Sequence, residues 1–271
     1  MLSSPNMRWL FTNGATELEN GKVQTWYGHN RSVGLEDFLP STYSEGKLMQ
    51  RRFKNLADTY LSGNKKDVLE IGAGSGDLSV YASTLYPQNT YTISDISPDM
   101  LNRFFPRVKQ WFKSDHDFKL AYFPAEQIPF PDESFDVVLM KSTVHHFDDF
   151  DKAFSEIRRV IRKGGVTVFV NDPVCANIPI YREIRNLTFA FKDRLCGSNC
   201  RIYPFSMYLK CGRSFSKAEW HYDPSMMEDI RNNKARMGLK QKIFAIIEKS
   251  PTLFGWFFAW RFASYVFVFT K

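Results

Sequence analysis

The residues with the clearest chemical meaning form a short segment in which an acidic side chain precedes three glycines. Glu70, Gly72, Gly74 and Gly76 alternate with other residues at the end of the apolar run 67–71 and directly after it. Glycines at this spacing let the backbone turn sharply and let a ligand approach closely, while a following helix presents free N–H groups. We therefore expect a strand, a ligand-binding loop and a helix in this order.

The position of the third glycine separates this loop from one that binds a dinucleotide. A pyrophosphate loop reads G-x-G-x-x-G, which would place the third glycine one residue after Gly76. Glu70 also suits a cationic amino-acid group better than a pyrophosphate. Asp95 ends the next predicted strand. A carboxylate there can accept hydrogen bonds from both hydroxyls of an adenosine ribose, with Ile96 against the adenine.

Two later segments extend the pattern. The loop Pro124–Asp136 reads PAEQIPFPDESFD, and it leads into a predicted strand that ends at Lys141–Phe147, KSTVHHF. In this order the pieces resemble the class I S-adenosylmethionine-dependent methyltransferases, in particular the large small-molecule group with an AE-x-hydrophobic-PF loop. The resemblance covers residues 65–172. It implies a Rossmann-like fold with S-adenosyl-L-methionine as the cofactor.

The resemblance also implies a role for each matching position. The implied cofactor-binding residues are Glu70, Gly72, Ala73, Gly74 and Gly76 for the methionine part, Asp95 for the ribose, Ile96, Ala125, Glu126 and Gln127 for the adenine region, and Lys141 and Ser142 toward the sulfonium. Family members usually carry an aspartate two places before the glutamate, where this chain has Pro124. The adenine amine would then use Glu126 or a backbone carbonyl.

Two adjacent histidines are the candidates for acid–base catalysis. His145 and His146 follow the predicted fourth strand, on the side where an acceptor is expected. Imidazole titrates near neutral pH, so it can deprotonate a hydroxyl. The alternative is that the pair packs beside the cofactor without transferring a proton. His221 and the segment Tyr27–His29 are further positions that could reach the pocket.

The four cysteines favour neither a metal site nor a disulfide framework. The chain has no Cys-x-x-Cys pair, and the spacing of Cys196, Cys200, Cys211 and His221 matches no common zinc pattern. The N-terminus also lacks the charged start and apolar run of a signal peptide. We therefore expect a reduced, cytoplasmic protein without a metal.

Alternating strands and helices must position these residues. Strands are predicted at 67–71, 91–95, 118–122, 135–140, 166–170 and 264–270, with a further one near His221, and helices at 44–61, 76–86 and 150–163. This order predicts an α/β fold: a doubly wound, Rossmann-like, mostly parallel seven-stranded sheet with an N-terminal helical cap and an insertion after the fifth strand. The expected divisions are a cap with the first helix (1–63), the cofactor-binding core (64–172), an insertion or lid with a basic helix (173–250), and a closing strand (251–271).

Composition and charge bear on the acceptor. The chain has 271 residues, 44% hydrophobic and 16% aromatic, with a net charge of +7 that lies mainly in residues 171–250. Such a surface attracts anionic substrates or an acidic membrane leaflet. Aromatic and basic residues alternate there, at Phe189, Phe191, Arg194, Arg201, Tyr203, Phe205, Tyr208, Lys210, Arg213 and Phe215. They form either a lid over an acceptor or a small satellite core. The amphipathic stretch 234–249 either packs on the sheet or lies on a membrane surface.

These observations predict a methyltransferase whose acceptor is a small molecule, anionic, aromatic or lipid-like. We expect methylation at oxygen, with nitrogen and carbon as alternatives. No specific nucleic-acid partner is expected, because the segment after the fourth strand lacks the Asn/Asp-Pro-Pro-Tyr/Phe loop that serves exocyclic amino groups. A non-catalytic cofactor-binding scaffold is one competing class. An NAD(P)-dependent oxidoreductase is another, disfavoured by the position of Gly76.

Overall fold

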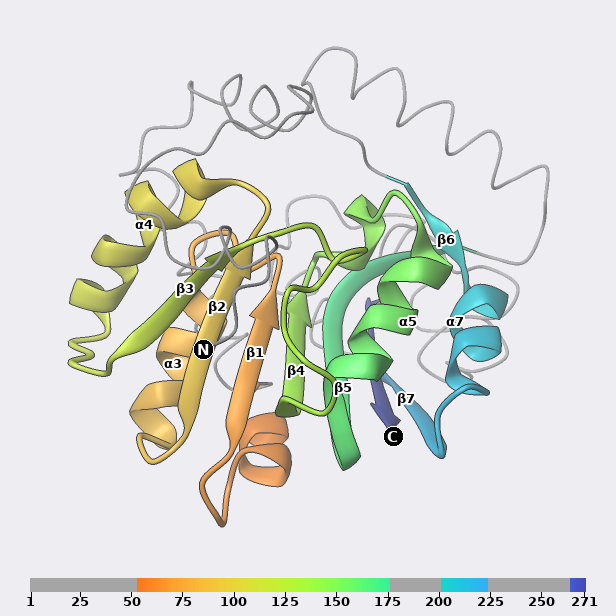
Figure 1. The fold of residues 1–271 in the computed structure, drawn as a ribbon, viewed down its shortest axis with the longest axis horizontal. Helices are drawn as coiled ribbons and strands as arrows, with labels where there is room; N and C mark the ends of the chain where they lie inside the picture. Colours follow the sequence, from red (N-terminus) through yellow and green to blue (C-terminus); the bar gives the residue numbers. More distant parts are fainter. Residues whose placement is uncertain (1–52, 176–200, 224–263) are drawn as a thin grey trace, which may run out of the picture.

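Seven strands form one mixed sheet in the order β3-β2-β1-β4-β5-β8-β7. The computed structural model describes residues 53–175, 201–223 and 264–271 (Figure 1). The strands are β1 (Asp67–Ile71), β2 (Thr90–Asp95), β3 (Phe118–Tyr122), β4 (Phe135–Lys141), β5 (Ile161–Cys175), β7 (Lys217–Asp223) and β8 (Ser264–Thr270). β1 to β5 are parallel, and β8 runs antiparallel to β5 and β7. The predicted mostly parallel, seven-stranded sheet is confirmed. A two-residue strand, β6 (Tyr203–Pro204), adds to the side of β5.

Helices cover both faces of the sheet, as a doubly wound fold requires. They are residues 53–60, α3 (Asp77–Leu85), α4 (Pro98–Trp111), the 3₁₀ turn η2 (Val144–His146), α5 (Phe150–Val160) and α7 (Phe205–Gly212). Alternate residues of the central strands point to opposite faces. Val68 and Val137 therefore pack with α3 and residues 53–61, whereas Leu69 and Val138 pack with α5 and α7.

The predicted helix 150–163 ends three residues early, at Val160. Ile161 has extended backbone angles and pairs with Phe135, so β5 begins at once. Gly165 is also drawn against β4: a Cβ atom there would lie 2.7 Å from the carbonyl oxygen of Asp136. The predicted C-terminal end of this helix was wrong, because the helical spacing of apolar residues gives no information on pairing between strands.

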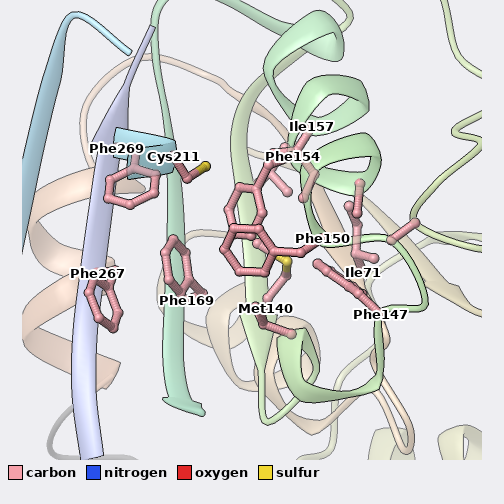
Figure 2. Close-up of a cluster of buried hydrophobic side chains, with 14 of the residues drawn as sticks. Ile71, Met140, Phe147, Phe150, Phe154, Ile157, Phe169, Cys211, Phe267 and Phe269 are labelled. Carbon is pink, nitrogen blue, oxygen red and sulfur yellow. The ribbon is translucent and has the colours of Figure 1, made fainter. Parts of the chain in front are cut away.

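An aromatic core lies between α5, α7 and the strands β5 and β8 (Figure 2). The ring of Phe267 stacks on Phe169 at a centroid distance of 4.9 Å and on Tyr208 at 4.6 Å. Tyr203, Phe205, Tyr208 and Phe215 are all buried in this core. The described members of the aromatic set therefore belong to the main core, and not to a lid.

Several sequence predictions lie outside the described residues. These are the N-terminal cap with Tyr27–His29, residues 44–52 of the first predicted helix, the positions from Phe189 to Cys200, and the stretch 234–249. Within the described ranges, no helix is long and apolar enough to cross a membrane.

Candidate functional site

The predicted site residues gather at the carboxyl edge of the parallel strands. Ile71, at the end of β1, lies beside Ser94 of β2 and Met140 of β4, and Lys141 lies beside Val170 of β5. The segments that follow β1, β2 and β4 are therefore neighbours in space, beside residues 170–172 of β5. This edge is where open α/β sheets bind their ligands.

Gly72 and Gly74 of the glycine loop lie in different surroundings. Gly72 and Gly74 both have positive φ angles, 62° and 57°. A Cβ atom on Gly72 would lie 2.2 Å from Cγ2 of Thr143, so that position allows no side chain. A Cβ atom on Gly74 would meet only Met100, at 3.8 Å. The loop is thus packed against β4 at Gly72 and leaves room for a ligand at Gly74.

Asp95 joins the end of β2 to this loop. Its buried carboxylate accepts hydrogen bonds from the backbone N–H of Gly74 at 2.7 Å and of Ser97 at 2.8 Å. Burial raises the pKa of Asp95 to about 6, although the backbone donors lower it. Each carboxylate oxygen can accept a second hydrogen bond. Asp95 can therefore hold the loop and also bind a pair of ligand hydroxyls, next to the half-buried Ile96.

Glu70 lies at the start of the loop, with its side chain buried. Its Oε2 accepts a hydrogen bond from the backbone N–H of Ser79, in the first turns of α3, at 2.9 Å. Burial raises the pKa of Glu70 to about 8, and the negative charge of Asp77 adds to this. Lys141, at the end of β4, forms an ion pair with Asp77. Two carboxylates, those of Glu70 and Asp77, and the ammonium group of Lys141 thus lie near the start of α3.

The loop between β3 and β4 is held by α5 and by the segment that precedes it. Ala125 is buried in the core, and Gln127 is exposed. Oε1 of Glu126 accepts hydrogen bonds from the backbone N–H groups of Asp148 and Asp149, at 2.7 and 3.2 Å. Glu126 therefore has a structural task that the sequence did not reveal, beside any contact with an adenine.

His145 has a carboxylate partner that sequence reasoning missed. Its Nδ1 lies 2.8 Å from Oδ1 of Asp172, and its backbone N–H donates to the same oxygen at 3.2 Å. The imidazole ring of His146 lies 3.9 Å from that of His145, between centroids. The signal available in the sequence was that Asp172 follows the fifth predicted strand, and parallel strands bring such residues to one edge.

Ser142, predicted near the sulfonium, uses its hydroxyl within the protein. Nδ2 of Asn171 donates to Oγ of Ser142 at 2.7 Å, and that Oγ lies 3.2 Å from the carbonyl oxygen of Asn171. Among the described residues, no group of three or more His, Cys, Asp or Glu side chains could hold a metal ion. Cys196 and Cys200 lie outside the described ranges.

The part of the chain that builds this edge also matches a known family. Residues 69–169 match the family described as "Methyltransferase domain". Sequence match and fold together identify this part of the chain as a domain of the class I S-adenosylmethionine-dependent methyltransferases, as the sequence predicted.

Similar proteins extend this result. A fatty-acid O-methyltransferase of Mycolicibacterium smegmatis is 32% identical over 42% of this chain and 40% of its own length. A demethylmenaquinone methyltransferase of Listeria welshimeri is 29% identical over 46% of this chain and 52% of its own. The chain therefore spans about half the length, or less, of these curated relatives.

Solved structures share the fold. The YcgJ protein of Bacillus subtilis aligns with a TM-score of 0.56 at 18% identity, over 81% of this chain and 97% of its own. The phosphoethanolamine N-methyltransferase 2 of Haemonchus contortus, solved with S-adenosylhomocysteine, aligns with a TM-score of 0.56 at 18% identity, over 89% and 61%.

Proposed function

We propose that the chain binds S-adenosyl-L-methionine at the carboxyl edge of β1 and β2. The observation that carries this proposal is the hydrogen bond from Gly74 N–H to the buried Asp95 carboxylate, beside the open side of the glycine loop, and we propose that this carboxylate accepts from the ribose hydroxyls. Glu70, buried at the start of the loop, supplies a negative charge for the ammonium of the methionine part. The residues present thus fit the cofactor that the family uses.

The other cofactor contacts that we propose follow the family pattern. They are Gly72, Ala73 and Gly76 along the loop, Ile96, Ala125, Glu126 and Gln127 around the adenine, and Lys141 and Ser142 toward the sulfonium. Ser142 and Glu126 already hydrogen-bond within the protein, so we propose that their backbone and remaining lone pairs make the contacts.

We further propose that the chain transfers the methyl group to a small-molecule acceptor, at oxygen. Two observations support transfer at oxygen: the imidazole of His145 stands at the same edge as the cofactor site, and the relatives include a fatty-acid O-methyltransferase. A second relative, a demethylmenaquinone methyltransferase, supports a small-molecule acceptor but not the choice of atom. His145 and His146 are the proposed catalytic residues. An acceptor that is lipid-like or aromatic is consistent with both relatives' names.

Methyl transfer from a sulfonium requires the protein mainly to align the donor with the acceptor and to remove a proton from the acceptor. A sulfonium is an activated methyl donor, so this chain's residues mainly orient the two reactants and exclude water. Glu70 and Asp95 hold opposite ends of the donor. The imidazole of His145 removes a proton where the acceptor carries one.

The first experiment is calorimetric titration of the full chain with S-adenosyl-L-methionine and, separately, with NADH. We expect micromolar binding of the methyl donor and no binding of NADH. Asp95→Asn halves the acceptors available to the ribose and should weaken donor binding about tenfold or more, since a lost charged hydrogen bond contributes about 1.5–3 kcal/mol.

Asp115→Asn, at an exposed carboxylate away from the edge, is the matched control and should bind normally. Binding of NADH in place of the methyl donor would overturn the assignment. Donor binding followed by transfer of a labelled methyl group from it to a metabolite extract identifies the acceptor. Binding without any transfer would favour the scaffold alternative.

A further inference from the structure

The imidazole of His145 is held on one side by a single carboxylate. Oδ1 of Asp172 lies 2.8 Å from the ring nitrogen Nδ1 of His145 and also accepts a hydrogen bond from the backbone N–H of His145 at 3.2 Å. This pair of contacts fixes the ring as well as the main chain. Since Nδ1 faces an acceptor-only oxygen, it must carry hydrogen, which leaves the lone pair of the neutral ring on Nε2.

A neutral side chain would be enough to accept the hydrogen bonds that Asp172 accepts, so its charged carboxylate needs another explanation. Its side chain is 1% exposed, and among the described residues its Oδ2 has no hydrogen-bond partner. An asparagine would offer one acceptor oxygen at a lower cost of burial. A buried negative charge is useful here if the imidazole beside it becomes positive, which happens when Nε2 takes up a proton.

The backbone around both residues is held in an uncommon shape. Ser142, directly after β4, and Asn171, within β5 where its pairing with β8 shifts register, both have positive φ angles, 53° and 60°. Left-handed backbone is unfavourable for residues other than glycine, and residues with such strain cluster at functional sites. Their side chains hydrogen-bond to each other at 2.7 Å. This hydrogen bond joins the segment after β4 to the irregular part of β5, where His145 meets Asp172.

We propose that Asp172 is the positioning residue of His145 and that the pair removes a proton from an acceptor hydroxyl of phenol-like acidity. This rests on the proposed methyl transfer and deepens it. The acceptor O–H proton goes to Nε2 of His145. The acceptor oxygen forms a bond to the methyl carbon as the carbon–sulfur bond breaks, and that bond's electron pair stays on sulfur. The imidazolium, stabilised by Asp172, then returns its proton to solvent.

This assignment separates two acceptor classes. A carboxylic acid is already ionised at neutral pH and needs no base, whereas a phenol with a pKa of about 10 remains protonated. Proton removal by a buried carboxylate and imidazole pair is needed only for the second class. We therefore assign a phenol-type hydroxyl, and not a fatty-acid carboxylate, as the acceptor group of this chain.

The first test measures the tautomer of His145 and needs no acceptor. The full chain with ¹⁵N-labelled histidine is studied by two-bond ¹H–¹⁵N NMR, with the His145 signals assigned from a His145→Gln spectrum. We expect hydrogen on Nδ1 in the wild type. Asp172→Ala removes the acceptor and should lose this preference, and Asp172→Glu should restore it at least in part. The proposal is wrong if His145 carries its hydrogen on Nε2 or if Asp172→Ala changes nothing.

The second test measures methyl transfer to two matched probes, 4-octylphenol and 4-octylbenzoic acid. We expect transfer to the phenol, and a loss of about 10²-fold or more in kcat for Asp172→Asn with an unchanged Kd for S-adenosyl-L-methionine. Asp117→Asn, at an exposed position, is the control.

The outcomes keep this inference and the proposed function apart. Transfer to the benzoic acid that is insensitive to Asp172→Asn, or transfer to neither probe, would overturn the hydroxyl assignment while donor binding stays intact. A wild-type chain that fails to bind S-adenosyl-L-methionine would overturn the proposed function itself.

Discussion

At the scale of single residues, the site is built from carboxylates that the protein has removed from water. Glu70, Asp95 and Asp172 are 1%, 3% and 2% exposed. Burial raises the pKa of Glu70 to about 8 and that of Asp95 to about 6. A cationic ligand group or ligand hydroxyls would favour the ionised forms of these two residues. The charge state of the site is therefore linked to ligand binding.

Glu70 should make donor binding depend on pH. Below pH 8 a growing fraction of Glu70 is protonated in the ligand-free protein, and a neutral carboxyl attracts an ammonium group weakly. We expect the affinity for S-adenosyl-L-methionine to increase from pH 7 to pH 8, by at most about tenfold per pH unit. Calorimetric titrations across this range measure it.

The Glu70→Gln variant isolates this effect. It should bind the donor more weakly and show a flat affinity between pH 7 and pH 8, because no titrating group remains at that position. Glu133→Gln, at the amino end of β4 and exposed, should keep the wild-type profile. An unchanged profile in Glu70→Gln would show that Glu70 only secures α3 through Ser79.

At the scale of elements, the glycine loop is fixed by its contact with the segment after β4. Gly72 lies against Thr143, whose hydroxyl donates to the carbonyl oxygen of Gly72 at 3.1 Å. The same segment carries His145 two residues later. The contact between the segments after β1 and β4 thus helps to position both the cofactor loop and the proposed base.

Gly72→Ala and Gly74→Ala should differ in stability although both glycines have left-handed backbone. Each substitution places a side chain at positive φ, which destabilises by about 1–2 kcal/mol. Only Gly72→Ala also drives a Cβ atom into Thr143, for about 1–3 kcal/mol more. Urea unfolding of both variants measures the difference.

Removing Thr143 provides the internal check on that comparison. In the double variant Gly72→Ala with Thr143→Ala, the two shortest contacts, with Cγ2 and Oγ1, are gone and only the 3.0 Å approach to Cβ remains. Most of the excess destabilisation over Gly74→Ala should therefore disappear, after correction for Thr143→Ala alone. Equal stabilities of the two single variants would contradict the contact. Gly74→Ala should instead weaken donor binding, because its side is the one open to a ligand.

At the scale of the whole molecule, the aromatic core couples the antiparallel end of the sheet to the cofactor-binding part. Phe267 of β8 contacts Phe169 of β5 and Tyr208 of α7, and Phe154 of α5 packs on Phe169 at 5.4 Å (Figure 2). Phe267 and its neighbours in β8 therefore pack against β5, the strand that carries Asp172.

Phe267→Ala should destabilise the fold by about 3–5 kcal/mol, as is typical when a fully buried aromatic ring is removed. Urea unfolding of the full chain measures this. Trp220→Ala, whose side chain is 37% exposed, is the aromatic control and should lose clearly less. Similar losses in the two variants would mean that the stacked rings contribute little beyond the surface they cover.

The local features of the fold were predictable from the sequence. The strands β3 and β8 begin and end as predicted, α3 and the glycine loop follow β1, and the parallel order follows from alternating strand and helix patterns. These features depend on residues close together in the chain, through periodicity, glycine and turn residues. The family resemblance rests on the same local segments.

The partners of the site residues were decided by the tertiary structure alone. Asp172 meets His145 across 27 positions of sequence, and Glu126 meets Asp148 across 22. Strand pairing also ended α5 at Val160, and tertiary packing buried Tyr203 and Tyr208 in the core. The sequence determined the fold class, the cofactor loop and the histidine pair, because each depends on near neighbours. The contact of Asp172 with His145 depends on how β4 and β5 align, and only the folded sheet sets that alignment.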